Sequence, residues 1–269
     1  MSAWPGKHFF ANLLARRTLL AEMVRRDFTR RFVGSSVGWL WMIVHPLVLL
    51  ASWTFVFHYC LGMRVPPGQR TGNYTLFLFC GQLPWLLFQD TVARSSTCLV
   101  ENSNLITKTL FPSEMIPVSI FLSSLVNHLM TLVLALVAVA IWGEGLSGWP
   151  ILLPAYILLL GLFSIGLGWI VASLQVFLRD TSQFTLVALT LWFWVTPIFI
   201  TVEQVPARFR FLMHLNPLST AVTSYRDLLL VSKAPNWQEL AWMSLAAGTV
   251  FLLGGLLFRQ LKPGFADVL

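Results

Sequence analysis

Six long apolar runs, separated by shorter polar segments, dominate the pattern of the chain. They extend over about residues 38–61, 74–98, 116–142, 151–178, 184–200 and 240–258. A transmembrane helix needs about 20 predominantly apolar residues to cross the hydrocarbon core of a bilayer. The segments between the runs leave no room for a soluble domain. The pattern therefore predicts an all-α polytopic membrane protein with six transmembrane helices.

The composition supports this class. Of the 269 residues, 57% are hydrophobic and only 11% are charged, which is typical of a multi-pass membrane protein rather than a soluble domain. The net charge is +7, but the basic residues flank the apolar runs, where they set topology. We therefore do not expect nucleic-acid binding.

The distribution of Lys and Arg predicts the orientation. If the N-terminus lies inside, the inner segments 1–37, 99–115, 179–183 and 259–269 hold eleven of these residues, and the outer segments hold six. Positively charged loops stay preferentially in the cytoplasm. We expect both termini, including a tail over residues 263–269, on the cytoplasmic side of the bacterial inner membrane.

The N-terminal segment 1–37 includes a basic amphipathic helix. Spacing places Arg25, Arg26, Arg30 and Arg31 together on one side of it, with aromatic residues between them. Such a helix lies in the headgroup plane, with its arginines on lipid phosphate. Two interpretations remain open: these arginines attract the anionic head group of a substrate, or they only orient the chain.

The inner loop over residues 100–117 is too polar to stay in lipid. Asn102 or Ser103 can cap a short helix that runs to about Leu110, where Pro112 would end it. A short polar helix on the inner face is well placed to be held by a soluble partner. An ordinary connecting loop is the alternative.

The outer segment 203–232 contains two amphipathic pieces, over about 206–215 and 217–231. Asn216 is a good N-cap, and Pro217 suits the first helical position. Arg226 and Asp227 interrupt the apolar second piece. We interpret the segment as a re-entrant pair of short helices near an outer gate, since backbone at membrane depth must be sheltered by protein or water. A surface-lying loop is the alternative.

Two further groups are candidates for function. Asp90 and Arg94 are four residues apart in the second run, so a helix places them on one face as an ion pair. Intramembrane charges usually face the bundle interior or a cavity, so the pair lies on a polar path or braces the helix. Trp192, Phe193 and Trp194 approach the outer end of the fifth run and either line a glycan channel or belong to the interfacial aromatic belt.

The sequence lacks the motifs of several kinds of catalytic and metal-binding site. It lacks the Gly-x-x-x-x-Gly-Lys-Ser/Thr phosphate loop and the Gly-x-Ser-x-Gly nucleophile turn. Its five histidines show no paired metal spacing. We expect no metal site, no catalytic residue and no ATP hydrolysis by this chain.

Five ordered motifs together resemble the ABC-2 type permeases that export polysaccharides and polyol phosphates. They are the arginine-rich helix, the pattern Phe32–Gly34–Gly38–Leu40–Trp41–Pro46, residues 110–114 with Leu-Phe-Pro-Ser-Glu ahead of Pro117, residues 177–180 with Phe-Leu-Arg-Asp, and the stretch from Asn216-Pro217-Leu218 to Tyr225-Arg226-Asp227. Each motif is loose, but the ordered set covers nearly the whole chain.

The resemblance implies an assembly. The permease would be a homodimer, and two copies of a separate ABC ATPase subunit would bind ATP and Mg²⁺, so that this chain binds no cofactor. Residues 38–262 would form the transmembrane domain, 17–33 an interface helix and 203–232 the gate helices.

The resemblance also implies residue roles. The ATPase-coupling helix would be about Glu101–Leu110, with Glu101, Asn102, Asn104 and Lys108. The gate helices would contain Asn216, Pro217, Arg226 and Asp227, and Tyr225 would join Trp192, Phe193 and Trp194 along the channel.

The expected substrate is a lipid-linked, O-antigen-like glycan on undecaprenyl diphosphate, since the motifs resemble the O-antigen and teichoic-acid branch more than the capsule branch. Capsular polysaccharide or teichoic acid, moved by the same mechanism, is the first alternative. An exporter of small molecules or lipids, and a membrane-embedded glycosyl- or acyltransferase, are the more distant ones.

Overall fold

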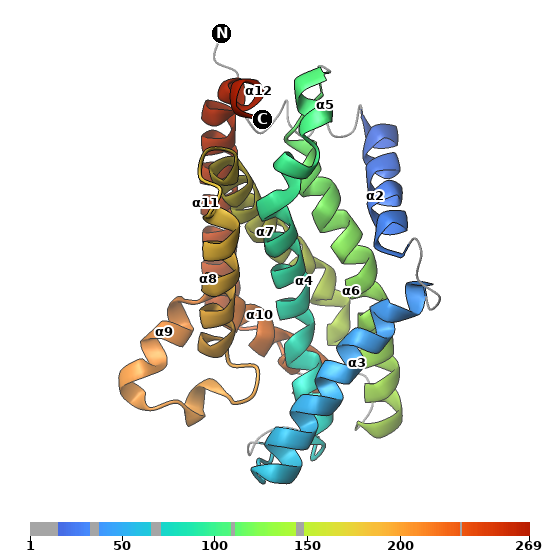
Figure 1. The fold of residues 1–269 in the computed structure, drawn as a ribbon. Coiled ribbons are helices and arrows are strands. Elements are labelled where there is room, and N and C mark those ends of the chain that lie inside the picture. The colour runs from blue at the N-terminus through green and yellow to red at the C-terminus, as the bar shows by residue number, and fades with distance from the viewer. Residues whose placement is uncertain (1–15, 33–37, 66–70, 109–110, 144–147, 232) are drawn as a thin grey trace.

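The computed structural model describes residues 16–32, 38–65, 71–108, 111–143, 148–231 and 233–269. Within these ranges the chain is helical, with no strand. Five helical segments are long and apolar enough to cross a membrane: Trp41–Cys60, Tyr74–Glu101, Met115–Trp142, Trp149–Phe177 and Trp237–Val268. They form one bundle, in which the connecting helices gather at its two ends (Figure 1).

The bundle is built around α4 (Tyr74–Glu101), which contacts α6 (Met115–Trp142), α7 (Leu153–Phe177), α8 (Thr181–Val195) and α10 (Pro217–Arg226). Its buried faces carry polar side chains such as Gln82, Thr91 and Ser95 together with large aromatic rings. A helix surrounded by protein does not have to be apolar on every face. This explains why α4 has the lowest hydropathy of the five segments.

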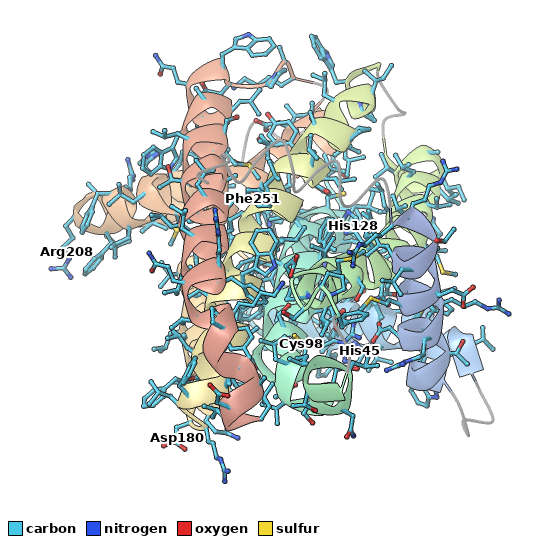
Figure 2. The ribbon with its side chains drawn as sticks, turned by 90° about the horizontal axis from the view of Figure 1, so that it is seen from above. His45, Cys98, His128, Asp180, Arg208 and Phe251 are labelled. Carbon is cyan, nitrogen blue, oxygen red and sulfur yellow. The ribbon has the colours of Figure 1, made fainter. Side chains whose placement is uncertain are left out.

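The helix α7 packs closely against α11 (Trp237–Leu261) through glycine. A Cβ at Gly166 would lie 2.6 Å from the carbonyl oxygen of Val250, and a Cβ at Gly254 would lie 2.8 Å from the carbonyl carbon of Gly166. Small residues let helix backbones approach one another in this way. The ring of Trp169 packs 4.9 Å from that of Phe251, which Figure 2 shows between the two helices.

The first predicted span is present as α3 (Trp41–Trp53) continued by a π-helical turn, η2 (Thr54–Cys60). A short 3₁₀ turn, η1 (Gly38–Leu40), precedes it, and η3 (Trp149–Leu152) precedes α7. The second span runs to Glu101 rather than residue 98. The last predicted span, 240–258, is longer than expected, because α11 begins at Trp237 and continues through η7 (Lys262–Gly264) into α12 (Phe265–Val268).

The fifth predicted span, 184–200, differs most from its observed helix. The helix α8 has 15 residues and ends at Val195, where Thr196 adopts an extended backbone, with φ −93° and ψ 132°. A residue that precedes proline is driven out of the helical region, and Pro197 follows here. At 1.5 Å per residue, α8 is about 22 Å long, shorter than the hydrocarbon core of about 30 Å.

The two ends of the bundle differ in their connections. One end, called here the α5 end, holds α5 (Ser103–Lys108), α12 and the start of α2 (Arg17–Phe32), which packs against α6 (Figure 1). The other, the α9 end, holds η4 (Val202–Gln204), η5 (Ala207–Phe209), α9 (Arg210–Leu215), α10 and the π-helical turn η6 (Asp227–Val231). Figure 2 shows Arg208 at the tip of this projecting segment, away from the bundle.

Candidate functional site

At the α5 end, an ionic network joins three helices. Arg94 of α4 donates through Nη2 to Oδ1 of Asp27 on α2, and its Nη1 lies 3.6 Å from Oδ2 of Asp90. The hydroxyl of Ser124 on α6 donates to the same Asp90 oxygen over 2.5 Å. The predicted pair of Asp90 and Arg94 is therefore present, and it belongs to a larger network that fixes α2 on the bundle.

A second contact ties α2 to the junction between α4 and α5. Arg26 donates through Nη2 to Oδ1 of Asn102 over 3.1 Å, and the Asn102 amide donates to the carbonyl oxygen of Cys98 over 2.8 Å. The Asn102 carbonyl accepts a hydrogen bond from the backbone N–H of Leu105, in the first turn of α5. Asn102 thus connects α4 to α5 through its backbone, and its side chain bonds to α2 and α4 instead of capping α5.

The predicted coupling helix begins later than expected, at Ser103. The predicted first residue, Glu101, is the last residue of α4, where it accepts a 2.6 Å hydrogen bond from Thr97. Asn104 is exposed on α5. Lys108 ends α5, and its side chain lies outside the described residues, as does Leu110.

The other side of α5 meets the C-terminal helix α12. Phe265 of α12 is fully buried, with its ring 5.3 Å from that of Phe258. Lys262 forms a 2.6 Å ion pair with Glu114, at the start of α6, and the Glu114 carbonyl accepts a 3.0 Å hydrogen bond from the indole of Trp169. The last residues of the chain are therefore part of the α5 end.

The four candidate head-group arginines lie on α2. Arg25 and Arg26 are exposed, and the side chains of Arg30 and Arg31 lie outside the described part of the chain. Arg26 has the contact with Asn102 described above. The acidic residue between them, Asp27, carries the ion pair to Arg94, and sequence analysis did not single it out.

At the α9 end, Asn216 organises the turn between α9 and α10. Its Oδ1 caps α10 by accepting the backbone N–H of Leu218 over 3.0 Å, and also accepts the indole N–H of Trp192 over 2.8 Å. Its amide donates to the hydroxyl of Thr196 over 3.1 Å. Pro217 occupies the first helical position, as its fixed φ favours. One side chain thus joins α10 to the end of α8.

Arg226, at the end of α10, is 2% exposed and binds backbone oxygen atoms. Its guanidinium donates to the carbonyls of Phe77, over 3.1 Å, of Pro197, over 2.7 Å, and of Ile198. It also lies 3.6 Å from the centre of the Phe77 ring. A Cβ at Gly81 would lie 2.7 Å from the Arg226 Cζ, so glycine makes room for it. Burial lowers the pKa of Arg226 to about 9, which leaves it charged at neutral pH.

The predicted channel aromatics occupy different environments. Trp194 is 62% exposed, whereas Tyr225 is fully buried and its hydroxyl lies 3.0 Å from Nε2 of His128. Trp192 and Phe193 are half-buried, and Phe193 packs against Trp53, Trp85 and Phe199. His128 belongs to α6, and Figure 2 places it inside the bundle.

Asp227 follows Arg226 directly and is half-buried. It lines a cavity of about 780 Å³ whose walls come from η4, α9, α10, η6 and the first turn of α11. Burial raises the pKa of the Asp227 carboxyl above its ordinary value, while Lys233 lowers it and Glu239 raises it. Among the described residues, no group of three or more His, Cys, Asp and Glu side chains is arranged to hold a metal ion.

Comparison with known proteins gives consistent matches. The chain matches the ABC-2 type transporter family over residues 18–230. It is 29% identical over 256 residues to the O-antigen export system permease protein RfbA of Myxococcus xanthus, covering 93% of this chain and 95% of that protein. An RfbA permease of Klebsiella pneumoniae is 27% identical over 252 residues, with the same coverage. Since the family match includes most of the bundle and both of its ends, this multi-pass membrane protein belongs to the ABC-2 type transporter family.

Proposed function

We propose that this chain is the transmembrane subunit of an ATP-driven exporter that moves a lipid-linked, O-antigen-like polysaccharide outward across the bacterial inner membrane. The observation that carries the proposal is the similarity to O-antigen export permeases over 93% of the chain. The alternatives within the same mechanism are capsular polysaccharide and teichoic acid.

The α5 end is the cytoplasmic end in this proposal. The segments that reach it, including α2 and the end of α11 with η7, carry most of the basic residues, and positively charged segments stay in the cytoplasm. Both termini are then inside and the α9 end is outside. The short helix α8 completes a sixth crossing, with Thr196–Ile200 extending it toward the outer surface.

A separate ABC ATPase subunit, which binds ATP and Mg²⁺, docks at the α5 end and contacts α5 and α2. The contact between Arg26 and Asn102 and the ion pair between Arg94 and Asp27 link these two helices to α4. A displacement of α5 would therefore move α2 and the central helix of the bundle together. In this mechanism, ATP-driven closure of two ATPase subunits supplies the displacement.

Two copies of the chain form the channel. The helix α8 presents an uncovered apolar stripe, made by Phe184, Val187, Leu191 and Trp194, each at least 60% exposed. These positions recur at helical spacing on one face, as a helix–helix or lipid-facing surface requires. We assign Trp194 to the channel side of the dimer, and we assign Trp192 and Tyr225 to packing in the state described here.

The substrate is expected to carry undecaprenyl diphosphate at its lipid end. Arg25, Arg26, Arg30 and Arg31 on α2 would attract this anionic group at the cytoplasmic surface, since guanidinium groups bind phosphate through charge-assisted hydrogen bonds. The glycan would leave past α9, α10 and η6, which act as gate helices. The buried state of α10 supports a re-entrant position, because protein shelters its backbone.

Deletion of the gene tests the proposal. The expected result is loss of the surface polysaccharide and accumulation of lipid-linked glycan on the cytoplasmic side, both reversed by the wild-type chain. Affinity purification of the chain from native membranes should recover an ATPase subunit. Normal surface polysaccharide in the deletion strain would exclude this function, and a membrane glycosyl- or acyltransferase would purify with no nucleotide-dependent partner.

A further inference from the structure

The cavity at the α9 end has the size and lining of a ligand site. Its volume of about 780 Å³ lies within the range of about 300–1,000 Å³ that small-molecule sites occupy. Of the sixteen residues that line it, only Val202, Met213 and Val231 have apolar side chains. The others supply hydroxyl, amide, carboxylate and basic groups. An apolar ligand would leave these polar groups without partners, so the lining selects for a polar one.

Two polar side chains in the wall lack partners. Ser219 is 4% exposed, and its Oγ has no hydrogen-bond partner among the described residues. The carboxylate of Asp227 forms no hydrogen bond or ion pair within the same part of the chain. Buried polar groups are normally hydrogen-bonded, so the unpaired hydroxyl of Ser219 requires an explanation, whereas Asp227 is a half-buried carboxylate that lines the cavity. A ligand that supplies both donors and acceptors would satisfy these two groups.

Other polar groups of the wall are already bonded. Arg210 donates to the carbonyls of Glu203 and Val205, over 2.7 and 2.9 Å, and Arg226 is committed to backbone carbonyls. The amide of Asn236 donates to Glu239 over 3.1 Å. Arg226 and two of the three nitrogen atoms of the Arg210 guanidinium are therefore engaged with backbone carbonyls, while carboxylates line the cavity. This wall disfavours an anion such as a phosphate group.

The basic groups in the wall also disfavour a simple cation. Lys233, Arg210 and His214 line the same cavity as the carboxylates of Glu203, Asp227 and Glu239. The ligand that fits a nearly balanced, hydroxyl-rich wall is uncharged and rich in hydroxyl groups. Sugars meet this description, because each hydroxyl both donates and accepts a hydrogen bond.

We propose that this cavity is a subsite for neutral sugar units of the exported glycan, in which Asp227 accepts and Ser219 exchanges hydrogen bonds with sugar hydroxyls. The inference rests on the proposed function and deepens it. Asp227 begins the π-helical turn η6, a conformation found frequently at functional sites. It also follows Arg226, which anchors α10 to the end of α8, so an occupied subsite would contact the proposed gate.

Binding by the purified full-length chain tests the subsite. The probe is the surface polysaccharide of the strain that carries this gene, released from its lipid by mild acid and cut to repeat-unit oligosaccharides. The variants are Asp227→Asn and Ser219→Ala, and Asp180→Asn is the matched control, since Asp180 is exposed on the connection between α7 and α8. Loss of a hydrogen bond to a charged group weakens binding by about tenfold or more.

The expected result is saturable binding by the wild type and Asp180→Asn, with about tenfold weaker binding by Asp227→Asn and a smaller loss for Ser219→Ala. Absence of binding by the wild type, or equal binding by all four proteins, would overturn the subsite. The proposed function is judged separately, by whether the deletion strain still displays its polysaccharide. The subsite alone fails if export depends on the gene and binding is unaffected by the substitutions.

Discussion

The two ends of the bundle are held together by different kinds of polar contact. At the α5 end, α2 and the C-terminus are attached by ion pairs whose side chains are a quarter to two-fifths exposed, between Arg94 and Asp27 and between Lys262 and Glu114. At the α9 end, α10 is attached by the fully buried Arg226, which binds carbonyl oxygens of α4 and of the turn after α8. The side chains of the first kind of contact are partly open to solvent, and Arg226 is not.

This difference predicts how each end moves. Fully exposed ion pairs contribute roughly 0–1 kcal/mol, and these partly exposed pairs should cost less to separate than a fully buried cation, so a partner that binds the α5 end can rearrange them more easily. A buried cation that loses its acceptors costs far more, since every group left behind is desolvated and unpaired. We therefore expect α2, α5 and α12 to shift relative to the bundle during transport. In contrast, α10, the end of α8 and the start of α4 should move as one body.

Substitution of Arg226 should have the largest effect. Arg226→Ala removes the buried donor that the carbonyls of Phe77, Pro197 and Ile198 share, and a buried acceptor left unpaired costs about 1–3 kcal/mol; it also removes the contact with the Phe77 ring. The free energy of unfolding should fall by several kcal/mol. The measurement is the temperature at which the detergent-purified protein loses its monodisperse peak.

Arg208→Ala is the matched control, because Arg208 is exposed on η5 and its removal leaves no buried group unpaired. Arg226→Lys should be intermediate, since an ammonium group keeps the charge but not the planar set of donors. Equal unfolding temperatures for Arg226→Ala and Arg208→Ala would show that α10 does not depend on this anchor.

Loss of the Asp27–Arg94 ion pair should have a moderate effect. It should reduce export more than it reduces the stability of the protein. Arg94→Gln leaves Asp27 and Asp90 without their shared cation, and Asp27→Asn removes one of the two acceptors. Residues of one network typically couple by about 0.5–3 kcal/mol. We expect the double variant to export no less than Arg94→Gln alone, measured as surface polysaccharide at equal amounts of inserted protein.

Glu22→Gln is the control for these single and double variants, because Glu22 is an exposed acid on the same helix, α2, and should tolerate the change. Losses that simply add in the double variant would mean that Asp27 and Arg94 act independently. In that case, the link between α2 and α4 would have to pass through Arg26 and Asn102.

The comparison also explains which features the sequence was able to predict. Long spans, the short helix after α4 and the cap formed by Asn216 and Pro217 depend on residues that are close in sequence. Their propensities and caps act locally. The early end of α8 has an equally local cause, the proline at residue 197, so the sequence alone contains the signal for a fifth span that ends before residue 200.

The polar contacts that hold the two ends together were not predictable in the same way. Spacing paired Arg94 with Asp90, four residues away, but its second acceptor is Asp27, 67 residues away. Arg226 was grouped with its neighbour Asp227, yet one of its acceptors is the carbonyl of Phe77, 149 residues away. Such pairings are set by how helices pack. Arg94 and Arg226 show most clearly how the two ends of the bundle differ, and their partners are the ones that neighbouring residues in the sequence predict least well.

The smallest expected effect concerns Asp227 and depends on pH. Burial raises the pKa of Asp227, so the folded state binds this proton more tightly than the unfolded state. Stability from this group is present below the ordinary aspartate pKa of about 3.9 and is lost as pH rises through the raised value. Asp227→Asn should therefore unfold at a slightly higher temperature than the wild type near neutral pH, and the difference should shrink as the pH is lowered.

Thermal unfolding of both purified proteins across this pH window measures the effect, with Asp180→Asn as the exposed control that should show no such trend. A difference that stays constant with pH would assign the gain to packing rather than to titration. The outcome also sharpens the contrast between the ends. Asp27 at the α5 end has Arg94 as its partner, whereas the carboxylate at the α9 end is kept in a cavity where a bound sugar, not the protein, would supply its donors.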